Sequence, residues 1–247
     1  MSKLQKLIKN YQSGKKISCV TAYDASISKF LESQGINIVL VGDSLGQVIK
    51  GNKNTHDVSL DEIIYHTKCV KAGIKKAILM VDFPKNTYNT KKQALYHARK
   101  LLRETRADII KLEVNNNLHV VRHLINSNIP VCAHLGLLPQ SIKSKSGFRK
   151  YGKTTKEANF ILKNALTLDA MGAQIILLEC IEAGLSKKIT NTVSCPVIGL
   201  GSGKYLDGQV AVIYDLLGIS FNKISTLSKD NSLYLEKIIK SSLKLGR

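Results

Sequence analysis

The chain of 247 residues contains no tryptophan, only four prolines and only five phenylalanines. No apolar run reaches the length of a membrane span, and residues 1–11 carry lysines where a secretory signal would have a continuous apolar stretch. No segment rich in proline and serine divides the chain, and no repeat of fixed period is found. We therefore expect a single domain over residues 1–247, in the cytoplasm, with no membrane partner.

Cysteine pairing is also missing. The five cysteines stand at positions 19, 69, 132, 180 and 195, none forms a Cys-x-x-Cys pair, and their number is odd. This argues against both a disulfide framework and a zinc ribbon. Cys132 and Cys180 lie in or beside expected strands, so we expect both to pack as small apolar residues.

Acidic residues are scarce: the chain has 18 of them and 37 basic residues, so its net charge is +19. Binding to nucleic acid is one interpretation. However, the lysines are scattered over expected helices and loops and do not form one stripe interleaved with aromatic residues. A solvated surface with a lysine-rich compositional bias explains this pattern better, and we expect no nucleic-acid partner. The charge would still attract small anions.

The most informative feature is a set of apolar runs that end in a polar, ionisable residue. Each run has the length and the branched aliphatic content of a strand buried on both faces, and helical patterns fill the gaps. This alternation predicts an α/β fold, a (βα)8 TIM barrel, with a short N-terminal helix over residues 3–11 that closes its floor. The runs and their terminal residues are Ile38–Gly42 with Asp43, Ala77–Val81 with Asp82, Asp108–Leu112 with Glu113, Ile129–Ala133 with His134, and Gln174–Leu178 with Glu179.

Weaker patterns complete the barrel. Ile17–Thr21 and Pro196–Gly199 read as strands, and Gln209–Tyr214 is the least secure candidate, for the eighth strand. Ser59 and Glu62 form a capping box at the start of a helix. Residues 136–153 make the longest irregular segment, which favours a lid. Further helices are expected over residues 24–33, 90–105, 118–126, 155–171, 185–191 and 231–245.

Residues at the carboxyl ends of barrel strands converge on one mouth, so these polar side chains should meet there. Crowded carboxylates repel one another unless a cation lies among them, which suggests a hard divalent metal ion. Asp43 is either a ligand or a helix cap, whereas Asp82 follows a buried strand and must be paired or ligating. Lys111 and Glu113 share a strand face, either as an ordering ion pair or as binding groups. Glu179 is a candidate general base.

Several segments together resemble the ketopantoate hydroxymethyltransferase family. They are TAYD at 21–24, VGDSLG at 41–46, YHTKCVKAG at 65–73, HLGLLPQS at 134–141, GAQIILLEC at 172–180, PVIGLGSG at 196–203 and DGQVAVIYDLLGI at 207–219. The resemblance implies a (βα)8 barrel, a Mg²⁺ ion and a homo-oligomer, commonly a decamer. It also implies transfer of a hydroxymethyl group from 5,10-methylenetetrahydrofolate to 3-methyl-2-oxobutanoate. The product, ketopantoate, belongs to pantothenate biosynthesis.

The resemblance also implies roles for individual residues. Asp43 and Asp82 correspond to the metal ligands, and Glu113 to an outer-sphere metal residue. Ser44 and Lys111 correspond to contacts with the oxoacid carboxylate, so Asp43, Ser44, Asp82 and Lys111 form the expected substrate site. His134 and Glu179 correspond to the acid–base pair. The chain departs from the family pattern at Val114, Asn115 and 148–150, which affects the expected folate contacts.

Two other functions stay open at this point. One is another Mg²⁺-dependent 2-oxoacid barrel, of the phosphonopyruvate or isocitrate lyase kind. Such enzymes usually place a catalytic cysteine in a lid loop, and residues 136–153 contain none. The other is a basic RNA-binding barrel, which would show steeply salt-dependent binding without turnover.

Overall fold

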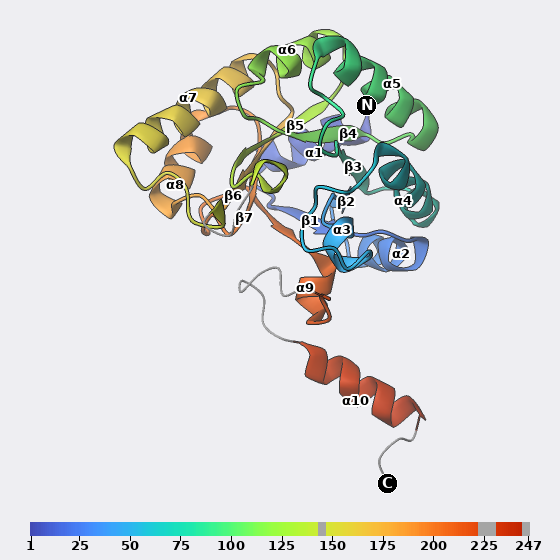
Figure 1. Ribbon diagram of the computed structural model, residues 1–247. Helices are drawn as coiled ribbons and strands as arrows, with labels where there is room; N and C mark the ends of the chain where they lie inside the picture. The colour runs from blue at the N-terminus through green and yellow to red at the C-terminus, as the bar shows by residue number, and fades with distance from the viewer. Residues whose placement is uncertain (143–146, 222–230, 244–247) are drawn as a thin grey trace.

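The computed structural model describes residues 1–142, 147–221 and 231–243. Eight parallel strands form a closed barrel in which each strand pairs with its neighbours in the sequence and β8 pairs with β1 (Figure 1). The strands are β1 (Ile17–Thr21), β2 (Ile38–Val41), β3 (Ile78–Asp82), β4 (Ile109–Glu113), β5 (Val131–Gly136), β6 (Ile175–Glu179), β7 (Val197–Leu200) and β8 (Gly208–Ala211).

Helices surround this barrel on the outside (Figure 1). Side-chain caps define many of their first residues, and the capping box of Ser59 and Glu62 is confirmed at the start of α4. The helices are α1 (Lys3–Gln12), α2 (Ala25–Ser33), α3 (Leu45–Val48), α4 (Leu60–Gly73), α5 (Lys91–Thr105), α6 (Leu118–Asn126), α7 (Thr155–Ala170), α8 (Ala183–Thr192), α9 (Ile213–Leu217) and α10 (Ser232–Leu243), with a 3₁₀ turn, η1 (Pro139–Ser141).

The barrel prediction is confirmed, but its last unit was drawn incorrectly. Gln209–Tyr214 is not one strand: β8 ends at Ala211, and α9 starts at Ile213, whose backbone N–H donates to Thr21 Oγ1 at 3.1 Å. No helix separates β7 from β8: residues 201–207 form an irregular segment with several bends. The expectation for Cys180 is also wrong, since its side chain is half-buried and its φ is +51°.

Two apolar cores lie on either side of the strands. The larger one fills the space between the strands and the outer helices. The smaller one fills the barrel itself and includes Leu4 and Leu7 of α1, which confirms that the N-terminal helix closes the floor. Lys3 Nζ donates to the carbonyl of Ala77 at 2.9 Å, just before β3 begins. Polar groups at the opposite, C-terminal ends of the strands therefore face a mouth that α1 does not cover.

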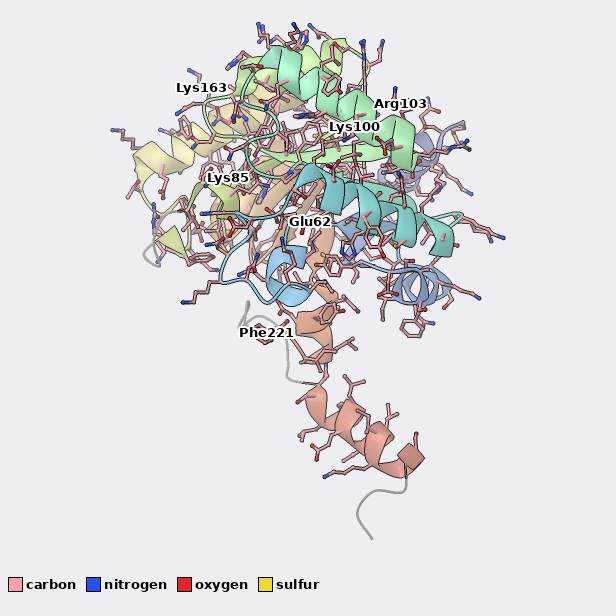
Figure 2. The ribbon with its side chains drawn as sticks, turned by 45° about the vertical axis from the view of Figure 1, so that its right-hand side comes forward. Glu62, Lys85, Lys100, Arg103, Lys163 and Phe221 are labelled. Carbon is pink, nitrogen blue, oxygen red and sulfur yellow. The ribbon has the colours of Figure 1, made fainter. Side chains whose placement is uncertain are left out.

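The outer surface carries most of the charge. Figure 2 shows Lys85, Lys100, Arg103 and Lys163 on the outside of the molecule, with Lys100 and Arg103 near one another on α5. Within the described part of the chain, no helix is long and apolar enough to span a membrane. Helix α10 lies apart from the barrel in Figure 1, and its apolar side chains are exposed.

Candidate active site

The site residues continue the inward-facing rows of the strands. Alternate residues of a strand point to the same face, and the barrel core holds Ile78 and Met80 of β3. The next residue in that row is Asp82, which is 1% exposed. By the same alternation, four more polar side chains point inward at the mouth. They are Lys111 and Glu113 of β4, His134 of β5 and Glu179 of β6.

Asp82 lies at the centre of the first cluster. Its Oδ2 accepts a hydrogen bond from Lys111 Nζ at 2.7 Å and one from the backbone N–H of Asp43 at 3.3 Å. Strand register explains the first contact, because Asp82 and Lys111 are paired across β3 and β4. The other oxygen, Oδ1, is buried and has no hydrogen-bond partner among the described residues. One carboxylate oxygen of Asp82 is therefore free for a ligand.

Gln140, in η1, connects Asp43 to Glu113. Its side-chain Nε2 donates to Asp43 Oδ2 at 2.9 Å, and its backbone N–H donates to Glu113 Oε1 at 2.8 Å. Ser141 Oγ donates to the second oxygen of Glu113 at 3.2 Å. Residues of the loop that follows β5 therefore bond to both oxygens of Glu113. These bonds are compatible with a carboxylate that does not bind the metal ion directly.

His134 and Glu179 form a second cluster. His134 Nε2 lies 3.2 Å from Glu179 Oε2, although the direction of approach does not meet hydrogen-bond geometry and neither ring nitrogen has a partner among the described residues. Burial, and then the nearby Lys111 ammonium, hold the pKa of His134 well below its usual range, so the ring is neutral. Burial raises the pKa of Glu179 to about 8.

Ser44 directly follows Asp43 after β2, and its hydroxyl bonds to a residue outside the two clusters. Its hydroxyl is 2.8 Å from the hydroxyl of Tyr23, which follows β1. Burial raises the pKa of Tyr23 far above its usual value, so this hydroxyl remains protonated. Ser44 is therefore present at the mouth without a direct bond to Asp43 or Asp82.

Carboxyl groups outnumber ammonium groups among the buried residues of the mouth. Burial raises the pKa of Asp82 to about 7 and that of Glu113 to about 8, and the neighbouring Asp43 carboxylate adds to both shifts. Burial opposes the charge on Lys111, but the attraction of Asp82 and Asp43 outweighs it and raises the pKa of Lys111. Full ionisation of these carboxyl groups therefore needs more positive charge than Lys111 supplies, and a divalent cation would provide it.

The residues fit such a cation as a two-carboxylate site. Within residues 1–142, 147–221 and 231–243, no three His, Cys, Asp or Glu side chains are grouped closely enough to hold a metal ion by themselves. Mg²⁺ commonly binds proteins through one or two carboxylates and completes its shell with water and substrate oxygens. The unpartnered oxygen of Asp82, next to Asp43, meets this requirement.

Sequence reasoning missed Gln140 and Tyr23, which bond directly to predicted residues, and Tyr88, which bonds to Gln140. Gln140 and Tyr23 stand inside the quoted segments HLGLLPQS and TAYD, so the signal was present, but neither residue type suggested a role. Tyr88, whose hydroxyl donates to Gln140 Oε1 at 2.7 Å, carried no signal at all. The predicted lid over 136–153 falls partly outside the described residues, since 143–146 are not described.

Sequence comparison gives consistent relatives. A family model described as ketopantoate hydroxymethyltransferase matches residues 2–244. The chain is 46% identical over 225 residues to 3-methyl-2-oxobutanoate hydroxymethyltransferase 1 of Aliivibrio fischeri, which covers 91% of this chain and 85% of that protein. It is 44% identical over 228 residues to the protein of the same name from Nitrosococcus oceani, which covers 92% and 86%.

Comparison of structures adds the fold. The chain resembles phosphoenolpyruvate phosphomutase from Streptomyces platensis subsp. rosaceus with a TM-score of 0.67 and 10% identity, over 99% of this chain and 88% of that one. It also resembles a phosphonopyruvate hydrolase solved with oxalate and Mg²⁺, with a TM-score of 0.65 and 9% identity, over 99% and 97%. At such identities the likeness shows a shared barrel architecture.

Proposed function

The chain belongs to the ketopantoate hydroxymethyltransferase family, and we infer that its barrel mouth carries out the family's reaction. The enzyme is a 3-methyl-2-oxobutanoate hydroxymethyltransferase: it adds a hydroxymethyl group to the 2-oxoacid and forms ketopantoate, in pantothenate biosynthesis. We locate the reaction at the barrel mouth because Asp82 has a buried, unpartnered carboxylate oxygen there, beside Lys111 and Asp43. The following assignments of residues are proposals.

Asp43 and Asp82 would hold a Mg²⁺ ion, with Glu113 acting from outside its shell. When bound, the ion supplies a Lewis acid that polarises the oxo group of the substrate. Lys111 has donors left after its bond to Asp82 Oδ2, and with Ser44 it would bind the substrate carboxylate. These contacts would hold the substrate with its C3 carbon toward Glu179 of β6.

Glu179 would remove the proton from C3. Burial raises its pKa to about 8, so its carboxylate is a much stronger base than an exposed one. His134 is neutral, and its Nε2 lies within reach of the carboxyl group that results from the transfer. The electron pair left at C3 would form the new bond to the methylene carbon of 5,10-methylenetetrahydrofolate. The two C–N bonds that hold this carbon to N5 and N10 of the folate would break, and water would supply the hydroxyl oxygen. The C3 proton and one proton of that water would pass to the two nitrogens, so that the folate leaves as tetrahydrofolate.

A lyase or mutase of the phosphonopyruvate kind is the second enzyme that the fold allows. The solved relatives of that kind are only about a tenth identical, whereas the hydroxymethyltransferases are nearly half identical over nine tenths of the chain. The absence of cysteine from residues 136–153 points the same way. We therefore do not favour this second function.

The direct test is ketopantoate formation from 3-methyl-2-oxobutanoate and 5,10-methylenetetrahydrofolate, with Mg²⁺ or with a chelator. We expect product only when metal and folate are both present. A matched assay offers phosphonopyruvate and 2-methylisocitrate to the same preparation. Turnover of either of these, with no ketopantoate, would replace the proposed function by the lyase or mutase alternative.

We further propose that the enzyme works in the cytoplasm as a homo-oligomer, a decamer. Its support is the family resemblance, and the exposed apolar side chains of α10, Leu233, Tyr234, Ile238 and Ile239, are compatible with contacts between copies. Sedimentation equilibrium tests this directly. A single species with ten times the mass of the chain is expected, and a monomer at micromolar concentration would contradict it.

A further inference from the structure

Gln140 is buried at the mouth and uses every part of its amide. The residue is 2% exposed. Its Nε2 donates to Asp43 Oδ2 at 2.9 Å and to the carbonyl oxygen of Phe83 at 2.8 Å, and its Oε1 accepts from the hydroxyl of Tyr88 at 2.7 Å. Three segments that are far apart in the sequence therefore meet on one side chain.

The orientation of this amide is determined by its partners. Phe83 O is always an acceptor, and the Asp43 carboxylate is an acceptor when ionised, so the NH₂ group must face both. The Tyr88 hydroxyl fixes the opposite end as a donor, and its ring stacks on Phe83 with ring centroids 5.9 Å apart. A flipped amide would place Oε1 against two acceptors and lose the hydrogen bonds to Asp43 and Phe83. The Phe83 carbonyl oxygen thus keeps the donor side of Gln140 turned toward Asp43, and Tyr88 holds the other end of the amide in place.

The backbone of Gln140 is held just as firmly. Its N–H donates to Glu113 Oε1 at 2.8 Å, and Ser141 Oγ donates to Glu113 Oε2 at 3.2 Å. His56 Nε2 also lies 3.1 Å from the carbonyl oxygen of Pro139. The turn over Pro139–Ser141 is therefore attached to the barrel from several sides, and the amide has a fixed base from which to hold Asp43.

These contacts leave one carboxylate oxygen, Oδ1, without a hydrogen bond on each of the two aspartates. Asp82 uses Oδ2 for Lys111 and for the backbone N–H of Asp43, and its Oδ1 has no partner. Asp43 uses Oδ2 for Gln140, and the described residues offer no hydrogen bond to its Oδ1. Groups that hydrogen-bond a metal ligand orient it and strengthen metal binding.

We propose that Gln140 is a positioning residue for Mg²⁺: by holding Asp43 Oδ2 it turns Asp43 Oδ1 toward the ion, and Tyr88 and Glu113 hold Gln140 in place. This inference rests on the proposed function, because it presumes that Asp43 is a metal ligand. Gln140 touches neither substrate nor metal in this role, and it acts through the carboxylate of Asp43.

Gln140→Met tests the proposal, since methionine has a similar volume and length but no amide. Titration calorimetry of the purified full-length protein with MgCl₂ should show an affinity about 10–100-fold below that of the wild type. Kinetics should show the KM for Mg²⁺ raised by a similar factor, while kcat at saturating Mg²⁺ stays close to the wild-type value. A merely structural role would lower kcat at every Mg²⁺ concentration and leave the KM for Mg²⁺ unchanged.

Tyr88→Phe is the second variant, in case Gln140→Met folds poorly. It removes one hydroxyl, keeps the ring stacked on Phe83 and leaves Gln140 intact. Without the hydroxyl that holds Gln140 Oε1, the amide is anchored less firmly, and Mg²⁺ affinity should fall about threefold to tenfold, the equivalent of about one hydrogen bond. An unchanged affinity in well-folded Tyr88→Phe would overturn the part of the proposal that concerns Tyr88.

Gln93→Met is the matched control. The Gln93 amide joins the loop before α5 to that helix: Nε2 donates to Asn86 O at 2.9 Å, and Oε1 accepts from Asn89 N–H at 3.0 Å. In these bonds it contacts no carboxylate. Mg²⁺ affinity should be unchanged in this variant. An equal loss in Gln93→Met and Gln140→Met would overturn the proposal, because the effect would then be general loosening.

Asp43→Asn distinguishes a failure of the proposed metal site from a failure of the proposed role of Gln140. If it loses Mg²⁺ while Gln140→Met binds as the wild type does, Gln140 has no positioning role and the proposed metal site stands. If Asp43→Asn and Gln140→Met both bind as tightly as the wild type, the metal assignment is wrong and the Gln140 proposal fails with it. Loss in both, with Gln93→Met unaffected, is the result we expect.

Discussion

Replacing a residue at the mouth leaves its hydrogen-bonding partner unpaired, and that partner differs between Asp82 and Asp43. Among the residues that the structure describes, Lys111 is the cation in contact with the carboxylates, and its side chain is only 8% exposed. Asp82 is its partner at 2.7 Å, whereas Asp43 bonds the neutral amide of Gln140. Two aspartates with the same proposed role should therefore behave differently when they are replaced.

We expect Asp43→Ala and Asp82→Ala both to lose most Mg²⁺ binding, but only Asp82→Ala to lose about 3–5 kcal/mol of unfolding free energy. The second change leaves the Lys111 ammonium buried without a partner. Calorimetry and urea denaturation measure the two effects. The double variant Asp82→Leu/Lys111→Met should recover stability but not metal binding. Unchanged Mg²⁺ affinity in both single variants would refute the metal assignment.

Glu179→Gln keeps the shape of the side chain and removes its basicity. Exchange of the C3 hydrogen of 3-methyl-2-oxobutanoate with deuterated solvent, followed by NMR, should slow by about two to four orders of magnitude. Binding of Mg²⁺ and substrate should persist. A wild-type exchange rate in a folded Glu179→Gln protein would make His134 the next candidate for the base.

The raised pKa of Glu179 also predicts the pH dependence. The group must be deprotonated to act, so the exchange rate should rise with pH and level off above a pH of about 8. The contribution of Glu179 to stability falls as the pH rises. The folded state holds this proton more tightly than the unfolded state, in which the pKa of Glu179 is near 4.5. The contribution of Glu179 is therefore complete below pH 4.5 and declines until about pH 8. Glu179→Gln should lack this decline, and an identical pH–stability curve would contradict the assignment.

At the scale of elements, the two ends of the barrel have separate tasks. Helix α1 closes the N-terminal end with Leu4 and Leu7, and the polar residues gather at the C-terminal ends of β3 to β6. A close approach of backbones holds one part of this mouth. At Gly136, whose φ is +101°, a Cβ atom would lie 2.2 Å from the carbonyl oxygen of Glu179, so only glycine fits there.

This separation predicts that the floor can be weakened without affecting the site. Leu7→Ala removes apolar packing from the barrel core and should lower the free energy of unfolding by about 2–3 kcal/mol. Mg²⁺ affinity, measured on the folded protein, should stay at the wild-type value. Lys6→Ala, an exposed change on the same helix, is the control and should cost under about 0.5 kcal/mol. Equal losses in the two variants would mean that α1 does not close the barrel.

At the scale of the whole molecule, the net charge of +19 is the dominant property. Lys85 and Lys163 lie on different parts of the outside in Figure 2. One groove on α5 is lined by several basic residues: Lys91, Lys92, Arg99, Lys100 and Arg103. Dispersed like charges repel one another and destabilise the compact state. The same field draws small anions, including a 2-oxoacid, toward the molecule.

Salt should therefore stabilise this protein. Raising the ionic strength from about 0.01 to about 0.15 M shortens the screening length from about 30 to about 8 Å, and the thermal midpoint should rise. Scanning calorimetry in NaCl measures this, with the neutral osmolyte sucrose as a comparison for non-electrostatic effects. A midpoint that falls with NaCl would mean that the surface ion pairs outweigh the general repulsion.

The amino-acid sequence by itself determined the barrel and most of the polar residues that meet at its mouth. Buried strands leave apolar runs, and a polar residue that ends such a run, as Asp82 and Glu179 do, is conspicuous because burying a charge there is costly. The capping box of Ser59 and the floor helix were equally local signals. The boundary of β8 was missed because apolar residues continue past Ala211 into α9.

Only the tertiary structure decided how these residues are connected. The bond from Gln140 to Asp43 joins positions 97 apart in the sequence, and that from Gln140 to Tyr88 joins positions 52 apart. A glutamine in a loop carries no periodic or charge signal, since its amide is satisfied equally well by water. Its role follows from burial beside a carboxylate, which depends on strand order and register and cannot be read from neighbouring residues.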